Sequence, residues 1–302
     1  MSIAACEGFA AQLRLPSPLE RLHDDRLRES GVAVWLKRDD LIHADVPGNK
    51  WRKLHPNLAE AVRAGEHVLL TFGGAYSNHI RATAAAGHYC GFSTIGIIRG
   101  EEHLPLNPSL SYAVRHRMRL GYLSRADYRR KNDPEVIAAL RREFGRFYLL
   151  PEGGSNALAA RGCTDIPAEI EMDFDLICCP VGTGGTLAGI AAGLAERQHA
   201  IGFSVLKGAG FLEREVRELQ QAAFGKRSGN WHIEHRFHFG GFARRDAELD
   251  AFIADFADRH AILLDWVYVA KMLFGVFTLA KHGVFSRGSR VVAVITGRPS
   301  AD

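Results

Sequence analysis

Residues 47–54 read PGNKWRKL, and this stretch decides how the rest of the chain is interpreted. A β-favouring run at 33–37 precedes it, and the Pro47-Gly48 pair predicts a sharp turn before a helix that begins near Lys50. A lysine at a helix start lies at the positive end of the helix dipole, which favours the neutral amine, the form that attacks a carbonyl. The same stretch is also typical of a surface lysine followed by a basic amphipathic helix. Other parts of the sequence decide between the two.

The composition is that of an ordinary globular protein. The chain has 302 residues, of which 47% are hydrophobic and 24% charged, which suits one or two domains. No stretch reaches the roughly 20 apolar residues that cross a bilayer, and the first residues lack the basic and apolar segments of a targeting peptide. The five cysteines and fourteen histidines follow no disulfide or metal-ligand spacing. We therefore expect a cytoplasmic protein with neither a membrane segment nor a metal site.

The net charge of +4 is mild, and the basic residues concentrate in one region. Residues 115–146 hold ten Arg or Lys against four acidic residues, with few aromatic residues between them. A nucleic-acid surface gathers its excess charge on one face, whereas a solvated helical face needs no partner. We favour the solvated face and expect no nucleic-acid partner.

Apolar runs of strand length alternate with helical stretches along most of the chain. Such alternation predicts parallel sheets with right-handed crossovers, so the expected fold class is α/β. A turn-rich stretch, PEGGSN at 151–156, predicts a boundary between two domains. The expected strands are 33–37, 67–72, 94–99, 120–124, 147–150, 175–181, 201–206, 233–239, 262–264 and 290–296, and the expected helices are 50–64, 80–88, one from 107, 135–144, 187–197 and 271–282.

A glycine-rich turn, GTGGT at 182–186, follows the strand expected at 175–181 and opens a helix of small residues. Glycines let backbone N–H groups converge on an anion at a helix amino terminus, and two threonine hydroxyls add donors, so the turn predicts a phosphate site. Tight packing or a nucleotide-binding fold would explain the same turn. A dinucleotide is disfavoured because Lys207 stands about where an acidic residue would bind its ribose.

Six motifs occur in order along most of the chain. They are VWLKRDDL at 34–41, GNK at 48–50 with RKL at 52–54, SNH at 77–79, GTGGT at 182–186, LDWVY at 264–268 and ITG at 295–297. With these motifs the chain resembles the pyridoxal-phosphate (PLP) enzymes of the tryptophan-synthase β-subunit fold, also called fold type II. Within that fold it resembles the family of D-cysteine desulfhydrases and 1-aminocyclopropane-1-carboxylate (ACC) deaminases.

The resemblance implies two α/β domains with open, mostly parallel twisted sheets. Residues 1–50 and 153–302 would form a larger domain that binds the cofactor phosphate, and residues 51–152 a smaller one, with the active site in the cleft between them. The resemblance further implies PLP as the cofactor, a small amino acid as the substrate, and a homodimer.

The resemblance also assigns roles to individual residues. Lys50 would carry the cofactor as a Schiff base and shuttle protons, while Ser77 and Tyr268 would act beside the substrate. Thr296 would face the pyridine nitrogen, where a neutral hydroxyl makes the ring a weaker electron sink than a carboxylate would, which favours elimination over transamination. The implied cofactor-binding residues are Lys50, Lys53, Asn78 (beside the phenolic oxygen), Gly182, Thr183, Gly184, Gly185, Thr186 and Thr296, and the implied substrate pocket is Asn49, Tyr76, Ser77, His79, Phe242 and Tyr268.

Several residues depart from the pattern of this family. ACC deaminases carry Glu where this chain has Val269 and Leu where it has Thr296, so opening of the cyclopropane ring is disfavoured. Phe242 replaces a family tyrosine, which removes a candidate acid–base group. Tyr76 replaces a common glutamine and Arg298 a glycine, and both changes would narrow or recharge the pocket.

The expected function is a PLP-dependent lyase or deaminase that eliminates the β-substituent of a D-amino acid. D-cysteine would give pyruvate, ammonia and sulfide. Three alternatives stay open. They are an ACC deaminase, a PLP-binding protein of this fold with another substrate or little turnover, and a nucleotide-binding oxidoreductase or basic RNA-binding protein, for which the glycine loop and the arginine-rich helices are the only support.

Overall fold

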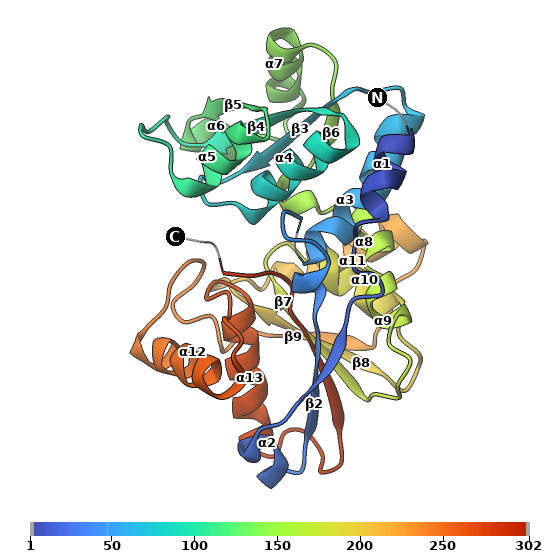
Figure 1. The fold of residues 1–302 in the computed structure, drawn as a ribbon, viewed down its shortest axis with the longest axis vertical. Coiled ribbons are helices and arrows are strands. Elements are labelled where there is room, and N and C mark those ends of the chain that lie inside the picture. The colour runs from blue at the N-terminus through green and yellow to red at the C-terminus, as the bar shows by residue number, and fades with distance from the viewer. Residues whose placement is uncertain (1–2, 47, 300–302) are drawn as a thin grey trace. The chain divides into compact units, whose positions relative to one another are not determined.

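The computed structural model describes residues 3–46 and 48–299, and these divide into two compact units. Unit 1 takes in residues 3–13 and 54–155, and unit 2 takes in residues 14–46, 48–53 and 156–299. The division falls inside helix α3 (Asn49–Arg63), after Lys53. The fold class is α/β, as expected (Figure 1). The predicted domain limits and the placement of the active site between the domains stay predictions.

Unit 1 is built on a four-stranded sheet whose neighbouring strands all run parallel. The strand order is β5-β4-β3-β6, which requires the helical crossovers that the sequence pattern predicts. Helices α4 and α5 pack on one face of the sheet, and α6 and α7 pack on the other. The elements are α1 (Ile3–Ala10), β3 (Val68–Gly73), α4 (Asn78–Cys90), β4 (Ser93–Arg99), α5 (Pro108–Arg115), β5 (Met118–Leu123), α6 (Arg125–Arg129), α7 (Pro134–Phe144), β6 (Tyr148–Leu150) and η2 (Glu152–Gly154).

Unit 2 is built on a six-stranded sheet of order β1-β2-β10-β7-β8-β9, in which only the β1–β2 pair is antiparallel. Helices α2, α12 and α13 cover one face of this sheet, and α8 to α11 cover the other (Figure 1). Adjacent residues of β7 therefore pack into different cores, with Cys178 in the core under α2, α12 and α13 and Cys179 in the core under α8 to α11. The elements are β1 (Leu19–Leu22), α2 (Asp25–Glu29), β2 (Ala33–Lys37), η1 (Asp39–Leu41), α8 (Ala157–Gly162), α9 (Asp165–Ala168), β7 (Leu176–Val181), α10 (Gly185–Ala192), β8 (His199–Ser204), α11 (Leu212–Phe224), β9 (Trp231–Glu234), α12 (Ala247–His260), α13 (Val269–Lys281) and β10 (Arg290–Val294).

Local sequence explains where the helices begin and end. The Ser77 hydroxyl accepts a hydrogen bond from the Ile80 N–H at 3.3 Å and so caps α4, which ends at Gly91 with a φ of 76°. Asn107 caps α5 in the same way, and Pro108 occupies its first turn. Both helices were predicted, with starts at 80 and 107, and the structure begins them within two residues of those positions.

One predicted strand of unit 2 is wrong, and two predicted elements end earlier than expected. Residues 262–264 form no strand, because this stretch pairs with no neighbour and Leu263 is 71% exposed. The strand predicted at 233–239 is β9, which ends at Glu234 where a loop of tight turns begins. The helix predicted to reach residue 197 ends at Ala192, where Gly193 packs against α9 and its preceding turn. Pro47, half of the predicted turn, lies outside the described residues.

Candidate active site

The turn that leads to Lys50 is built onto the ends of two strands. The Gly48 N–H donates to the Asp39 carbonyl at 2.8 Å, beyond β2, and the Asn49 N–H donates to the Thr296 carbonyl at 3.3 Å, beyond β10. Gly48 has a φ of +69°, and a Cβ at this position would stand 1.7 Å from the Thr296 oxygen. Only glycine fits so close an approach. Lys50 and Thr296 are therefore brought together at the carboxyl ends of parallel strands, where open α/β sheets bind ligands.

The amine of Lys50 has a lowered pKa, so a large fraction of it is neutral near physiological pH. The residue keeps partial exposure to solvent, yet the protein atoms around the amine displace water, and this burial is the largest cause that lowers its pKa to about 7. The nearby charge of Lys53 lowers the pKa further, while Asp265 opposes the shift. Burial and the charge of a second lysine are thus the main causes of the lowered pKa. From the sequence, the helix dipole was the expected cause of this lower pKa instead.

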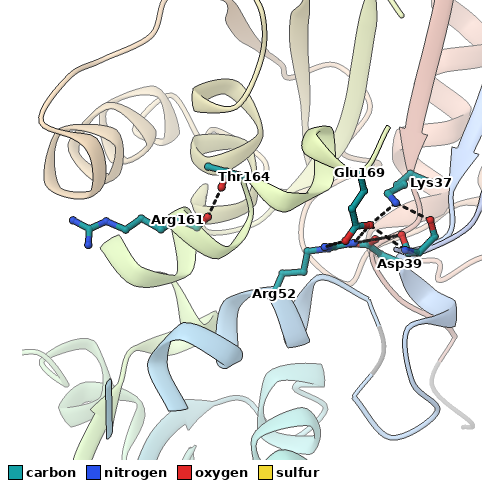
Figure 2. A network of polar contacts seen from close by, with 7 residues as sticks. Lys37, Asp39, Arg52, Arg161, Thr164 and Glu169 are labelled. Atoms are coloured by element: carbon teal, nitrogen blue, oxygen red, sulfur yellow. Dashed lines mark hydrogen bonds and ion pairs between the residues drawn. The ribbon is translucent and has the colours of Figure 1, made fainter. Parts of the chain in front are cut away.

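A buried network of charges holds the first turn of α3 (Figure 2). The guanidinium of Arg52 donates to both carboxylate oxygens of Asp39, each at 2.9 Å, and to both oxygens of Glu169 at 2.7 and 2.8 Å. Lys37 completes the set by donating to Glu169 at 2.6 Å. The side chains of Arg52, Asp39 and Lys37 are at most 2% exposed. The two positive and two negative charges of this network neutralise one another. Because Arg52 is held by four charge-assisted hydrogen bonds, it fixes the helix two residues after Lys50.

The predicted phosphate loop lies at the start of α10, in the same unit as Lys50. Gly184 has a φ of +78° and precedes the helix, whose first N–H groups have no partner within the helix. Asn49 donates to the hydroxyl of Thr186 at 2.8 Å, which ties the Lys50 turn directly to the glycine loop. Earlier in the loop, Gly182 is partly buried and Thr183 is exposed. The arrangement offers convergent N–H donors to an anion.

Tyr268 stands over the glycine loop. A Cβ at Gly182 would lie 3.2 Å from the Tyr268 ring, so the tyrosine rests on this glycine. The Phe242 ring meets the Tyr268 ring edge to face, with centroids 5.9 Å apart. Tyr268, Phe242, Gly182 and Thr186 are all in unit 2.

Asp265 is absent from the predicted site residues, although it stands in the LDWVY motif. Its carboxylate accepts the Tyr268 N–H at 2.6 Å and thereby fixes the tyrosine at the start of α13. Burial raises the pKa of Asp265 to about 6, against the opposing effects of backbone hydrogen bonds and the charge of Lys50. An aspartate three residues before a residue at a helix start was the available signal.

Two buried thiols near Lys53 also escaped prediction. Burial raises the pKa of Cys163 to about 11 and that of Cys179 to about 12, while the charge of Lys53 opposes both shifts. Burial also lowers the pKa of Lys53. Together with the two neutral thiols, this indicates that protein atoms largely exclude water from the region around Lys53, three residues after Lys50. Cysteine spacing carried no sign of it, because Cys163 and Cys179 lie on different elements.

The remaining predicted residues, at 76–79, belong to unit 1. Tyr76 is 64% exposed, Asn78 is partly buried, and Ser77 caps α4. His79 is buried, with Nε2 hydrogen-bonded to the Thr71 hydroxyl at 2.9 Å. The expected roles of these residues toward cofactor and substrate stay predictions.

Two departures from the family pattern have clear positions. The Val269 side chain is completely buried in the core between α13 and the sheet, so it offers no surface to a ligand. The Nε of Arg298 donates to the Asp40 carbonyl at 3.0 Å, which fixes the chain just after Thr296.

The residues of unit 2 fit a phosphorylated aldehyde. Lys50 offers an amine whose pKa of about 7 leaves much of it neutral at that pH, the start of α10 offers donors for a phosphate, and Thr296, only 9% exposed, offers a hydroxyl. Within residues 3–46 and 48–299, no group of three or more His, Cys, Asp or Glu is arranged to bind a metal ion. In the same residues, every helix is too short or too polar to cross a bilayer.

Comparison with known proteins agrees with this chemistry. The family model described as "Pyridoxal-phosphate dependent enzyme" matches residues 11–297. The chain is 30% identical to the mitochondrial bifunctional D-cysteine desulfhydrase/ACC deaminase of Arabidopsis thaliana, over 94% of this chain and 76% of that protein. It is 29% identical to the D-cysteine desulfhydrase of Salmonella newport, over 93% and 91%. A crystal structure of an ACC deaminase homologue matches with a TM-score of 0.83 at 27% identity, covering 98% of this chain and 95% of that one.

Proposed function

The chain belongs to the pyridoxal-phosphate dependent enzymes, and we propose that within this family it eliminates the β-substituent of D-amino acids, with D-cysteine as substrate. PLP is the cofactor, and the enzyme is of the deaminase and desulfhydrase type. D-cysteine and water would give pyruvate, ammonia and sulfide. We assign Lys50 as the residue that carries the cofactor.

The contact between Thr296 and the Lys50 turn carries this proposal. The Thr296 carbonyl accepts a hydrogen bond from the N–H of Asn49, the residue before Lys50, which supports a role for the Thr296 hydroxyl beside the Lys50 amine. A hydroxyl does not force a proton onto a pyridine nitrogen as a carboxylate would, which supports elimination over transamination. The glycine loop at 182–186, tied to Asn49 through Thr186, is proposed to bind the phosphate.

The proposed chemistry uses residues of unit 2. When bound, PLP supplies an electron sink that makes the α-hydrogen of an amino acid acidic. Lys50, with a pKa of about 7, is matched to take that proton as a general base and to return it later. The electron pair left on the α-carbon forms the Cα–Cβ double bond as the Cβ–S bond breaks and sulfide leaves. Tyr268 is proposed to give the leaving sulfur a proton, and Asp265 to hold Tyr268 in place.

ACC ring opening is the second candidate, because the Arabidopsis relative has both activities by name. The absence of a glutamate at Val269 was one of the sequence arguments against it, beside Thr296 in place of a leucine. Since the Val269 side chain is buried in the core, the residue does not discriminate by contact with a substrate. The preference for D-cysteine now depends on Thr296 and Phe242.

Steady-state kinetics of the purified holoenzyme test the proposal. We expect kcat/KM for D-cysteine to exceed that for ACC by at least about tenfold, a difference of about 1.4 kcal/mol in barrier. A Lys50→Ala variant should lose both activities and serves as the blank. Equal or faster turnover of ACC would overturn the preference, and no turnover of either would refute the assigned substrate class. The expected homodimer and cytoplasmic location stay predictions.

A further inference from the structure

A buried lysine on α13 lies outside the residues assigned so far. Lys271 has no exposed surface, and its Nζ donates to the carbonyl oxygens of His238 at 2.9 Å and Gly241 at 2.8 Å. Burial lowers its pKa to about 8, with the charge of Asp265 opposing the shift. A methionine would fill the same space without the cost of burying a charge. Compared with a methionine, the contribution that the Lys271 ammonium makes to the structure is therefore these two hydrogen bonds.

Both acceptors belong to residues 237–245, here called the Phe242 loop. Its backbone makes two consecutive turns, in which the Gly241 N–H donates to the His238 carbonyl at 3.0 Å and the Arg244 N–H donates to the Gly241 carbonyl at 3.1 Å. The Lys271 ammonium binds the closing carbonyl of each turn. One side chain thus holds both turns in register.

The Phe242 loop needs such a support because its backbone is strained. The φ angles are positive at Phe239 (51°), Gly240 (85°), Gly241 (121°) and Ala243 (50°). Two of these residues carry a Cβ, for which a left-handed conformation is unfavourable, and it persists only where surrounding contacts enforce it. The ammonium of Lys271 provides these contacts at the backbone itself.

The Phe242 loop presents one large apolar side chain beside the proposed site. Phe242 is 50% exposed, and the covered part of its ring meets Tyr268 edge to face at 5.9 Å. Tyr268 in turn rests on Gly182, the first glycine of the proposed phosphate loop. A shift of the turns would therefore move Phe242 away from the residue proposed to face the substrate.

We propose that Lys271 is a positioning residue for substrate selection, which holds the Phe242 loop so that Phe242 forms an apolar wall against Tyr268 for a small β-substituent. This inference rests on the proposed function, because Tyr268 faces a substrate only if the site is the one described. Lys271 itself is not proposed to touch substrate or cofactor. Its effect reaches the substrate through Phe242.

The test compares Lys271→Met, which keeps the volume and removes the donors, with Lys281→Met as the matched control. Lys281 is an exposed residue at the last position of the same helix. The first readout is the rate of tryptic cleavage after Arg244 and Arg245, which are both exposed in the Phe242 loop. It is measured on the enzyme without cofactor or substrate. The second readout is KM and kcat of the holoenzyme for D-cysteine, for Lys271→Met, Phe242→Ala and the double variant.

We expect Lys271→Met to accelerate cleavage after Arg244 and Arg245 by at least about tenfold, and to raise KM about tenfold while kcat changes less than about twofold. Phe242→Ala should raise KM similarly, and the double variant should be no worse than either single variant, because both remove the same wall. Additive effects on KM, or a loss of kcat with unchanged KM, would overturn the specificity role. Unchanged cleavage would overturn the positioning role. If the wild type fails to turn over D-cysteine, the proposed substrate is wrong, and the cleavage rate still decides whether Lys271 holds the loop.

Discussion

Replacing Glu169 by glutamine removes one charge from the network beneath Lys50 and keeps its shape. Arg52 would then keep the carboxylate of Asp39, but Lys37, whose other acceptor is the carbonyl of Ser17, would be left as a buried positive charge without its anionic partner. Breaking a buried pair in this way costs about 3–5 kcal/mol. The pKa of the Glu169 carboxyl gives a second measure of how strongly the network stabilises the fold. Burial raises it, but the hydrogen bonds and charges of Arg52 and Lys37 outweigh burial and lower the pKa of Glu169 from 4.5 to about 2.

That shift corresponds to about 3 kcal/mol of folding free energy, and solvent screening of a side chain that is 17% exposed reduces it toward about 2 kcal/mol. Because the folded pKa is lower than the unfolded value, the stabilisation is complete above pH 4.5 and is lost as the pH falls toward 2. The difference between wild type and Glu169→Gln should therefore be largest at neutral pH and should shrink over this window.

Urea unfolding at neutral pH, with thermal scans from neutral pH into the acid range, measures both quantities. Glu171→Gln is the matched control, since Glu171 is an exposed residue two positions along the chain. We expect a loss of at least about 2 kcal/mol for Glu169→Gln and little change for the control. A loss below about 1 kcal/mol at neutral pH, or a difference that does not shrink in acid, would refute the account of the network.

Three further predictions concern the residues around Lys50. Gly48→Ala should destabilise the protein by at least about 3 kcal/mol, measured by urea unfolding, because a Cβ would meet the Thr296 oxygen at 1.7 Å and the backbone would have to move; a loss within about 0.5 kcal/mol would contradict the close approach. Competitive acetylation of the enzyme without cofactor, read by mass spectrometry, should label Lys50 half-maximally near pH 7, since the neutral amine reacts and burial with Lys53 lowers its pKa; labelling that needs a pH near 10 would show an ordinary lysine. Val269→Glu should lower the melting temperature without raising ACC turnover, because the carboxylate would be buried in the core; a stable variant with increased ACC turnover would contradict the position of this side chain.

The start of α3 was predictable because local chemistry determines it. A glycine before Asn49 and Lys50 marks a backbone that must turn sharply, and the structure confirms a positive φ and a close approach at Gly48. The glycine loop was predictable for the same reason, as Gly184 occupies a left-handed conformation before α10. Such features depend on neighbours in sequence.

The network beneath Lys50 was not predictable, because its members meet only in the folded chain. Glu169 and Arg52 are 117 residues apart in sequence, and nothing local in either residue indicates a partner. The same holds for Lys271, whose acceptors are backbone carbonyls of the Phe242 loop. A lysine near the start of a helix that is otherwise apolar as far as Phe277 was the one available signal.

Helices α11 and α12 could have been predicted and were missed. Leu212, Val216 and Ala223 of α11 are buried and share one face of the helix, which is an amphipathic spacing visible in the sequence. The strand predicted at 262–264 failed for the opposite reason. A short apolar run fits a strand by composition. Here Leu264 is buried and Ile262 packs against the core, but Leu263 faces solvent and the stretch pairs with no strand.

Reduction of the holoenzyme with borohydride, followed by peptide mapping, tests the central assignment of Lys50 most directly. Reduction fixes the cofactor to the lysine that carries it, so one labelled peptide identifies that residue. The lowered pKa of Lys50 and the hydrogen bond from the N–H of the preceding residue, Asn49, to the Thr296 carbonyl predict that the label is on Lys50. A label on Lys53, Lys207 or Lys271 with Lys50 unmodified would contradict the assignment.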